Sequence, residues 1–264
     1  MSAVFSIDKS KVRQSFAAAA KTYDGLATLQ RKVGLELVNN SVLNKSCADK
    51  VVLDVGCGTG FLTQKIQSKL TPRRTIAVDI ALSMVKAAKT KLKQSDAICA
   101  DAEYLPLLDD SVDKIVSNLA LQWCENLSDV FIGFNRMLKQ DGRVFFSTFG
   151  PTTLQELKQS WAEVDDYTHV NDFYSIDELT VFLQQTGFKD IKIEAKCYQS
   201  TYRTVIELMR ELKGIGAHNV LSGRNRNMTS KTQMQNMLNA YEKHRINSLI
   251  PATYEIIFVS ARKG

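Results

Sequence analysis

The chain has 264 residues, of which 44% are hydrophobic and 23% are charged, and its formal net charge is +6. These values are typical of a globular protein with a sizeable core, and a membrane span is excluded because no run of about 18 apolar residues occurs. The opening residues lack a basic segment followed by an apolar one, so we expect no secretory signal and predict a cytoplasmic protein. Five scattered cysteines without a Cys-x-x-Cys pair and three distant histidines argue against disulfides and against a metal site.

The pattern of the first 150 residues predicts an α/β fold. Two helical patterns come first and are interrupted at Tyr23-Asp24-Gly25. Short β-branched runs then alternate with helical patterns, which is typical of a doubly wound, mostly parallel sheet with right-handed crossovers. The expected helices are 8–22, 26–43, 61–70, 82–93 and 127–138, and the expected strands are 51–55, 75–78, 97–100, 112–117 and 143–149.

After Gly150-Pro151 the pattern becomes mainly helical. Two further strands bring the expected sheet to seven, and Ser175 with Glu178 forms a capping-box signature at the start of a helix. The expected helices of this part are 153–164, 176–185, 204–213 and 230–244, and its expected strands are 189–197 and 253–261.

A glycine-rich turn after the first strand is the strongest functional signal. The strand runs into Gly56-x-Gly58-x-Gly60 and then into a helix, which brings backbone N–H groups up to a ligand. No lysine follows Gly60, which excludes a P-loop, and Phe61 stands where a dinucleotide fingerprint has its third glycine. Asp54 would repel a pyrophosphate, but it could help to hold a ligand with an ammonium and a sulfonium. This pattern favours S-adenosylmethionine (SAM).

Polar residues at the ends of three further strands support this interpretation, because ligands of open α/β sheets bind at the carboxyl ends of strands. Asp79 could accept hydrogen bonds from both ribose hydroxyls. Asp101 could accept one from an adenine amino group, with the N–H of Ala102 facing a ring nitrogen. Asn118 ends the fourth strand beside the same site.

Several of these motifs resemble known families. The segments Leu53-Asp-Val-Gly-Cys-Gly-Thr-Gly60 and Ser117-Asn-Leu-Ala-Leu-Gln-Trp123 are similar to motifs of the class I SAM-dependent methyltransferases. Three more segments resemble the malonyl-acyl-carrier-protein O-methyltransferases of biotin synthesis, over nearly the whole chain. They are Ser15-Phe-Ala-Ala-Ala-Ala20 with the following Tyr23-Asp24, Leu212-Lys-Gly-Ile-Gly-Ala217, and Pro251-Ala-Thr-Tyr-Glu255.

The resemblance implies a single methyltransferase domain over residues 1–264. We expect an N-terminal helical cover (1–45), a SAM-binding half (46–150) and a substrate half (151–264) whose helical insertions, 151–187 and 198–250, form a lid. The cofactor-binding residues it implies are Gln30, Asp54, Gly56, Cys57, Gly58, Gly60, Asp79, Ile80, Met84, Asp101, Ala102, Asn118 and Leu119.

The resemblance also implies methyl transfer to the free carboxylate of a malonyl thioester. A carboxylate is ionised at neutral pH and is its own nucleophile, so no general base is required. Candidates for gripping it are Tyr23, Gln122, Trp123 and Arg203. The expected partner is malonyl-acyl-carrier protein or malonyl-CoA, with no nucleic acid and no membrane. An acidic carrier protein would suit the basic residues of the second insertion, Lys213, Arg224, Arg226, Lys231, Lys243 and Arg245, although a solvated lid explains them nearly as well.

Three alternatives stay open. The first is a methyltransferase for another small molecule, such as a quinone or a free carboxylic acid. The second is a related mitochondrial complex I assembly factor that acts as an arginine hydroxylase or a scaffold, although no Arg/Ser-rich presequence is visible. The third is a SAM-binding protein without catalysis.

Overall fold

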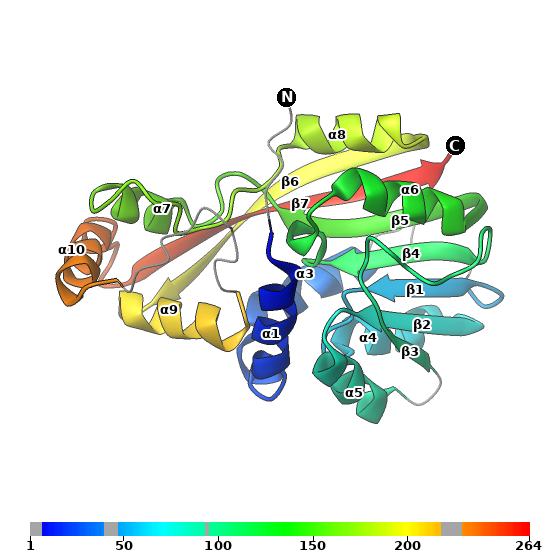
Figure 1. The fold of residues 1–264 in the computed structure, drawn as a ribbon, viewed down its shortest axis with the longest axis horizontal. Helices are drawn as coiled ribbons and strands as arrows, with labels where there is room; N and C mark the ends of the chain where they lie inside the picture. Colours follow the sequence, from blue (N-terminus) through cyan, green and yellow to red (C-terminus); the bar gives the residue numbers. More distant parts are fainter. Residues whose placement is uncertain (1–6, 40–46, 93–94, 218–228) are drawn as a thin grey trace.

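The computed structural model describes residues 7–39, 47–92, 95–217 and 229–264, and it contains a seven-stranded sheet in the order β3-β2-β1-β4-β5-β7-β6 (Figure 1). Strands β1 to β5 run parallel, and β7 is antiparallel to both of its neighbours, which confirms the predicted fold class. The strands are β1 (Val51–Val55), β2 (Arg74–Asp79), β3 (Ser95–Cys99), β4 (Val112–Asn118), β5 (Leu138–Phe149), β6 (Phe188–Tyr202) and β7 (Ile250–Lys263).

Side-chain caps fix where several helices begin. Asp8 accepts hydrogen bonds from the backbone N–H groups of Ser10 and Lys11 at the start of α1, and Ser175 with Glu178 forms the predicted capping box of α8. The helices are α1 (Lys9–Ala19), α2 (Tyr23–Leu26), α3 (Thr28–Val38), α4 (Phe61–Leu70), α5 (Leu82–Lys91), α6 (Leu127–Met137), α7 (Gln155–Ala162), α8 (Ile176–Gln185), α9 (Val205–Gly214) and α10 (Lys231–Glu242).

Helices cover both faces of the sheet. Successive residues of a strand point to opposite faces, so neighbouring residues pack against different helices. Val52 of β1 packs with α3 and α4, whereas Leu53 packs with α6 and α8. On the α4 side, Ala77 of β2 packs against Ala88 of α5. The mainly apolar character of the central strands therefore reflects burial on both faces.

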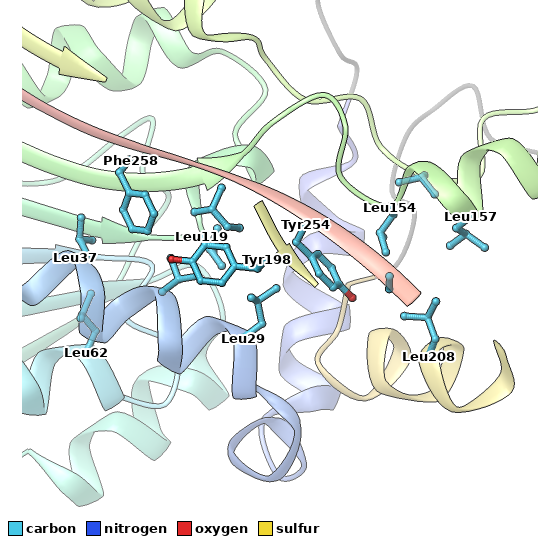
Figure 2. Packing of buried hydrophobic residues seen from close by; sticks show 14 of the residues in the cluster. Leu29, Leu37, Leu62, Leu119, Leu154, Leu157, Tyr198, Leu208, Tyr254 and Phe258 are labelled. Atoms are coloured by element: carbon cyan, nitrogen blue, oxygen red, sulfur yellow. The ribbon is translucent and has the colours of Figure 1, made fainter. Parts of the chain in front are cut away.

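Strands β6 and β7 are the longest of the sheet and extend beyond the other strands, where they carry α7, α9 and α10 (Figure 1). One buried cluster joins this extension to the rest of the fold. Figure 2 shows it running from Leu37 and Phe258 past Tyr198 and Tyr254 to Leu208. The cofactor-side and extension-side helices thus share one core.

The structure corrects several predicted boundaries. The break at Tyr23 is itself a short helix, α2, and β5 begins at Leu138 rather than at 143. Strand β6 continues to Tyr202 because it stays paired with β7 as far as Ile250, so the insertion predicted to begin at 198 was placed too early. The helix expected at 26–43 is described only as far as Val38, and residues 40–43 lie outside the described ranges.

None of the helices in the described ranges combines the length and the apolar character that crossing a membrane requires.

Candidate functional site

The turn after β1 is built around glycines in the left-handed region, with φ of 75° at Gly56 and 53° at Gly58. The N–H groups of Gly56 and Cys57 both donate to the carbonyl of Val78, at 2.8 and 2.9 Å, which ties the turn to the end of β2. A Cβ atom at Gly56 would lie 2.2 Å from the Cβ atom of Ala120, so only glycine fits there.

A cavity of about 660 Å³ opens at the carboxyl ends of β1, β2 and β4, next to this turn. We call it the cofactor cavity. The structure brings nine of the predicted cofactor-binding residues together on its walls: Gly56, Gly58, Asp79, Ile80, Met84, Asp101, Ala102, Asn118 and Leu119.

Asp79 organises the centre of the cofactor cavity. Its carboxylate accepts from the N–H of Gly58 and from that of Ala81, both at 2.9 Å, so it connects the glycine turn to the start of α5. Burial raises the pKa of Asp79 to about 6.

Helix α1 also contributes to the cofactor cavity, through Lys9, Val12 and Phe16. The Nζ atom of Lys9 lies 2.8 Å from Oδ1 of Asp101 and 2.7 Å from Oε1 of Glu103, so an ion pair holds α1 against the loop after β3. The sequence pattern of α1 could not reveal this role, because the contact joins residues 92 positions apart.

Asp54 does not lie on the wall of the cofactor cavity, which corrects its predicted place. Because successive residues of β1 point to opposite faces, the side chain of Asp54 faces α4. It is fully buried there, and it accepts a hydrogen bond from Oγ1 of Thr63 at 2.5 Å. Its Oδ1 atom has no hydrogen-bond partner, and burial raises its pKa to about 7. Gly60 is also absent from the wall, because it packs on α5 near Ala88.

A smaller cavity adjoins the other side of the glycine turn, and Tyr23, Gly56, Gly58 and Asn118 line both it and the cofactor cavity. Two more predicted residues, Gln30 and Cys57, lie here. The carbonyl of Gln30 accepts from Nδ2 of Asn118 at 2.9 Å, which fastens α3 to the end of β4. Arg31 lines the same cavity and adds a cation that sequence reasoning did not identify.

A third cavity, of about 830 Å³, reaches from the cofactor cavity into the β6–β7 extension. We call it the acceptor cavity. Four residues line both it and the cofactor cavity: Phe16, Tyr23, Leu119 and Trp123. This shared wall comes from α1, α2 and the segment after β4, so the two cavities adjoin here.

Three of the four predicted acceptor residues line the acceptor cavity, and two of them, Tyr23 and Trp123, lie at the shared wall. Burial and the nearby Asp79 raise the pKa of Tyr23, so its phenol keeps its proton and can donate a hydrogen bond. Gln122 lines the acceptor cavity, and its Nε2 donates to the carbonyl of Leu119 at 2.7 Å. Trp123 packs edge-on against Phe16, with ring centroids 5.5 Å apart.

The fourth predicted residue, Arg203, is not brought into the site. It is exposed at the end of β6, outside both cavities, and its carbonyl accepts from Arg245. Of the basic residues expected to meet a partner, Lys213, Lys231 and Lys243 are exposed, whereas Arg224 and Arg226 lie outside the described residues.

The cysteines near the site are not poised for covalent chemistry. Burial raises the pKa of the Cys124 thiol to about 12 and that of Cys57 well above its usual value. Because the thiolate is the nucleophile, both side chains are inert packing groups. Within the described ranges, no cluster of three or more His, Cys, Asp or Glu side chains could hold a metal ion.

Comparison with known proteins agrees with this arrangement. Residues 53–146 match the family described as methyltransferase domain. A malonyl-[acyl-carrier protein] O-methyltransferase of Gallionella capsiferriformans is 36% identical over 268 residues, which cover 98% of this chain and 92% of that protein. The chain belongs to the malonyl-acyl-carrier-protein O-methyltransferase family.

Other members of this family occur as parts of longer proteins. The biotin biosynthesis bifunctional protein BioHC of Cellvibrio japonicus is 38% identical over 254 residues, which cover 96% of this chain and 50% of that protein. Among solved structures, the YcgJ protein of Bacillus subtilis superposes with a TM-score of 0.61 at 18% identity, over 88% of this chain and 97% of that one. This last likeness supports the class I methyltransferase fold.

Proposed function

We propose that this chain is a SAM-dependent O-methyltransferase that methylates the free carboxylate of a malonyl thioester at the start of biotin synthesis. The observation that carries the proposal is its likeness to malonyl-[acyl-carrier protein] O-methyltransferases over 98% of its length, which includes the segments that form both cavities. The shared wall supports the proposal, because a methyl donor in the cofactor cavity and a methyl acceptor in the acceptor cavity would be adjacent there.

The residues of the cofactor cavity fit SAM. When bound, SAM supplies an electrophilic methyl group on a sulfonium centre. Asp79 retains acceptor capacity for the ribose hydroxyls, and Arg31, which lines the smaller adjoining cavity, suits the carboxylate of the methionine part. Asp54 is buried below the turn with an unpartnered Oδ1, and its ionised form would favour a cationic ligand.

The acceptor carboxylate requires a donor and a dry environment rather than a base. In our proposal, two groups donate to it: the phenol of Tyr23 at the shared wall and the amide of Gln122, which lines the acceptor cavity. Phe16, Leu119 and Trp123 keep water away from the reacting atoms. Positioning and the exclusion of water then provide most of the rate acceleration.

We further propose that α1 and α2, within the expected N-terminal cover, close the cofactor cavity. The ion pair of Lys9 with Asp101 and Glu103 supports this role. An acyl-carrier protein is the proposed partner, and coenzyme A is the alternative carrier of the same malonyl thioester.

Incubation with methyl-labelled SAM tests the function. We expect label in malonyl-acyl-carrier protein or malonyl-CoA, as a methyl ester that mild base hydrolyses. Free malonate and a quinone acceptor serve as the competing substrates. Labelling of these alone, or of no malonyl thioester, would contradict the proposal.

A further inference from the structure

One buried amide in the acceptor cavity lacks the hydrogen bonds that its burial calls for. Asn171 is only 7% exposed and lines this cavity, yet its Oδ1 atom has no hydrogen-bond partner. Its side chain makes no hydrogen bond to any other described residue. A buried amide in this state destabilises the folded protein, so a ligand that completes its hydrogen bonds would be bound favourably.

The segment that carries Asn171 is held firmly on both sides. Before it, the His169 ring stacks on Trp161, with centroids 3.7 Å apart and an interplanar angle of 7°, and its Nε2 lies 2.7 Å from Oδ1 of Asp165. After it, Phe173 packs against Phe149 of β5, with centroids 5.3 Å apart. The amide is therefore positioned before any ligand arrives, which lowers the entropic cost of binding.

The chemistry around Asn171 indicates which ligand group it would meet. The wall of the same cavity includes Leu154, Leu157 and Val170, whose side chains form no hydrogen bonds, and its polar side chains include Thr153, Glu211 and Tyr254. A primary amide has both a donor and an acceptor, so its natural complement is another amide. The reacting carboxylate must lie at the shared wall, and the rest of the substrate must extend into the acceptor cavity.

We propose that Asn171 binds a secondary amide of the pantetheine arm that carries the malonyl thioester. This assignment rests on the proposed function and deepens it, because acyl-carrier protein and coenzyme A share this arm. Asn171 then recognises the carrier arm rather than the reacting group, and it selects carried malonyl thioesters over free malonate.

Truncated substrates test the pairing directly. The malonyl thioester of N-acetylcysteamine contains one amide, and that of ethanethiol contains none. We expect the wild-type protein to use the amide-containing thioester with a kcat/KM about tenfold higher. Asn171→Leu, which keeps the side-chain shape, should remove this preference through KM and leave the affinity for SAM unchanged.

The thermal stability of the variant provides a second measurement, because replacing a residue that only supports the fold would lower Tm. Asn171→Leu removes an unsatisfied buried amide, so its Tm should equal or exceed that of the wild type. The matched control is Asn135→Leu, because Nδ2 of Asn135 donates to the carbonyl of Thr186 at 3.0 Å and Asn135 lines neither cavity. The control should lower Tm and leave the kinetics unchanged. Asn171→Ser repeats the test should the leucine variant fail to fold.

The results separate this inference from the proposed function. If the wild type methylates no malonyl thioester, the function itself is wrong. If the wild type is active but Asn171→Leu weakens both truncated thioesters equally, Asn171 does not bind the arm. The loss should be similar for malonyl-CoA and malonyl-acyl-carrier protein, and a loss confined to the carrier protein would instead indicate a protein contact.

Discussion

Tyr23 lines all three cavities: the cofactor cavity, the acceptor cavity and the smaller cavity beside the glycine turn. A Cβ atom at Gly58 would lie 3.8 Å from its ring, so the tyrosine closes over the glycine turn. Its neighbour Asp24 accepts from Oγ1 of Thr59 at 2.5 Å and pairs with Lys91, which fixes α2 to the turn and to α5. These contacts of Asp24 hold the neighbouring Tyr23 at the shared wall.

We expect Tyr23→Phe to lower kcat for a malonyl thioester about tenfold, because it removes one hydrogen-bond donor and keeps the ring. The affinity for SAM should change less than about twofold on the same grounds. Steady-state kinetics and calorimetry measure the two effects. Tyr104→Phe is the control, since Tyr104 is 75% exposed and lines neither cavity. An unchanged kcat would remove the phenol from the reaction.

The raised pKa values of Asp54 and Asp79 predict that cofactor binding depends on pH. Burial raises their pKa values to about 7 and about 6, from 3.8 for an ordinary aspartate. Between about pH 4 and pH 7 the folded protein holds protons that the unfolded chain has lost, so these two groups lower stability as pH rises. A cationic ligand favours their ionised forms.

We therefore expect the affinity for SAM to rise from pH 5.5 to pH 7.5, roughly the window of these raised pKa values, with protons released on binding. Calorimetry in two buffers of different ionisation enthalpy measures both quantities. Proton uptake, or an affinity that does not change over this range, would contradict the assignment.

At the scale of elements, the glycine turn has no room for a side chain at Gly56. We expect Gly56→Ala to lower the free energy of unfolding by about 2 kcal/mol or more, because it combines a positive φ with a steric clash. The clash is with Ala120, so adding Ala120→Gly should restore part of this loss but not the cost of the backbone conformation. Urea denaturation of the single and double variants measures both. A double variant no more stable than Gly56→Ala would show that the clash is not the cause.

Most elements of the parallel half could be predicted to within a few residues, because each central strand is a short, mainly apolar run, although the start of β5 at Leu138 could not. The ends of β6 and β7 could not. Residues such as Gln199 and Ser200 give no strand signal, and they are extended only because β7 pairs with them. Similarly, Gly56, Asp79 and Asn118 belong to local motifs that sequence reasoning can find. Lys9 and Asn171 reach the cavities through distant contacts that no local pattern encodes.

At the scale of the molecule, one buried cluster spans both the cofactor side and the β6–β7 extension. It includes Val52 of β1 and Ile66 of α4, and also Leu208 of α9 and Tyr241 of α10. The two regions therefore should not unfold independently, although their helices lie far apart in Figure 1.

The two tryptophans report on the two regions, since Trp123 lies at the shared wall and Trp161 lies in α7. We expect Trp123→Phe and Trp161→Phe variants to show a single fluorescence transition each in urea. The midpoints should agree once corrected for the stability change that each substitution causes. If Trp161, observed alone in the Trp123→Phe variant, reports a transition at a lower urea concentration than Trp123, the β6–β7 extension unfolds separately.

The place of β7 also affects how the protein is made. This strand lies between β5 and β6, yet residues 250–263 leave the ribosome about a hundred residues after β5. Until then β5 presents an unpaired edge, and the nascent chain is open to pairing with other chains. Folding is therefore a late event in synthesis, and fusions or truncations that disturb residues 250–263 should reduce the yield of native protein more than changes at the opposite edge, β3.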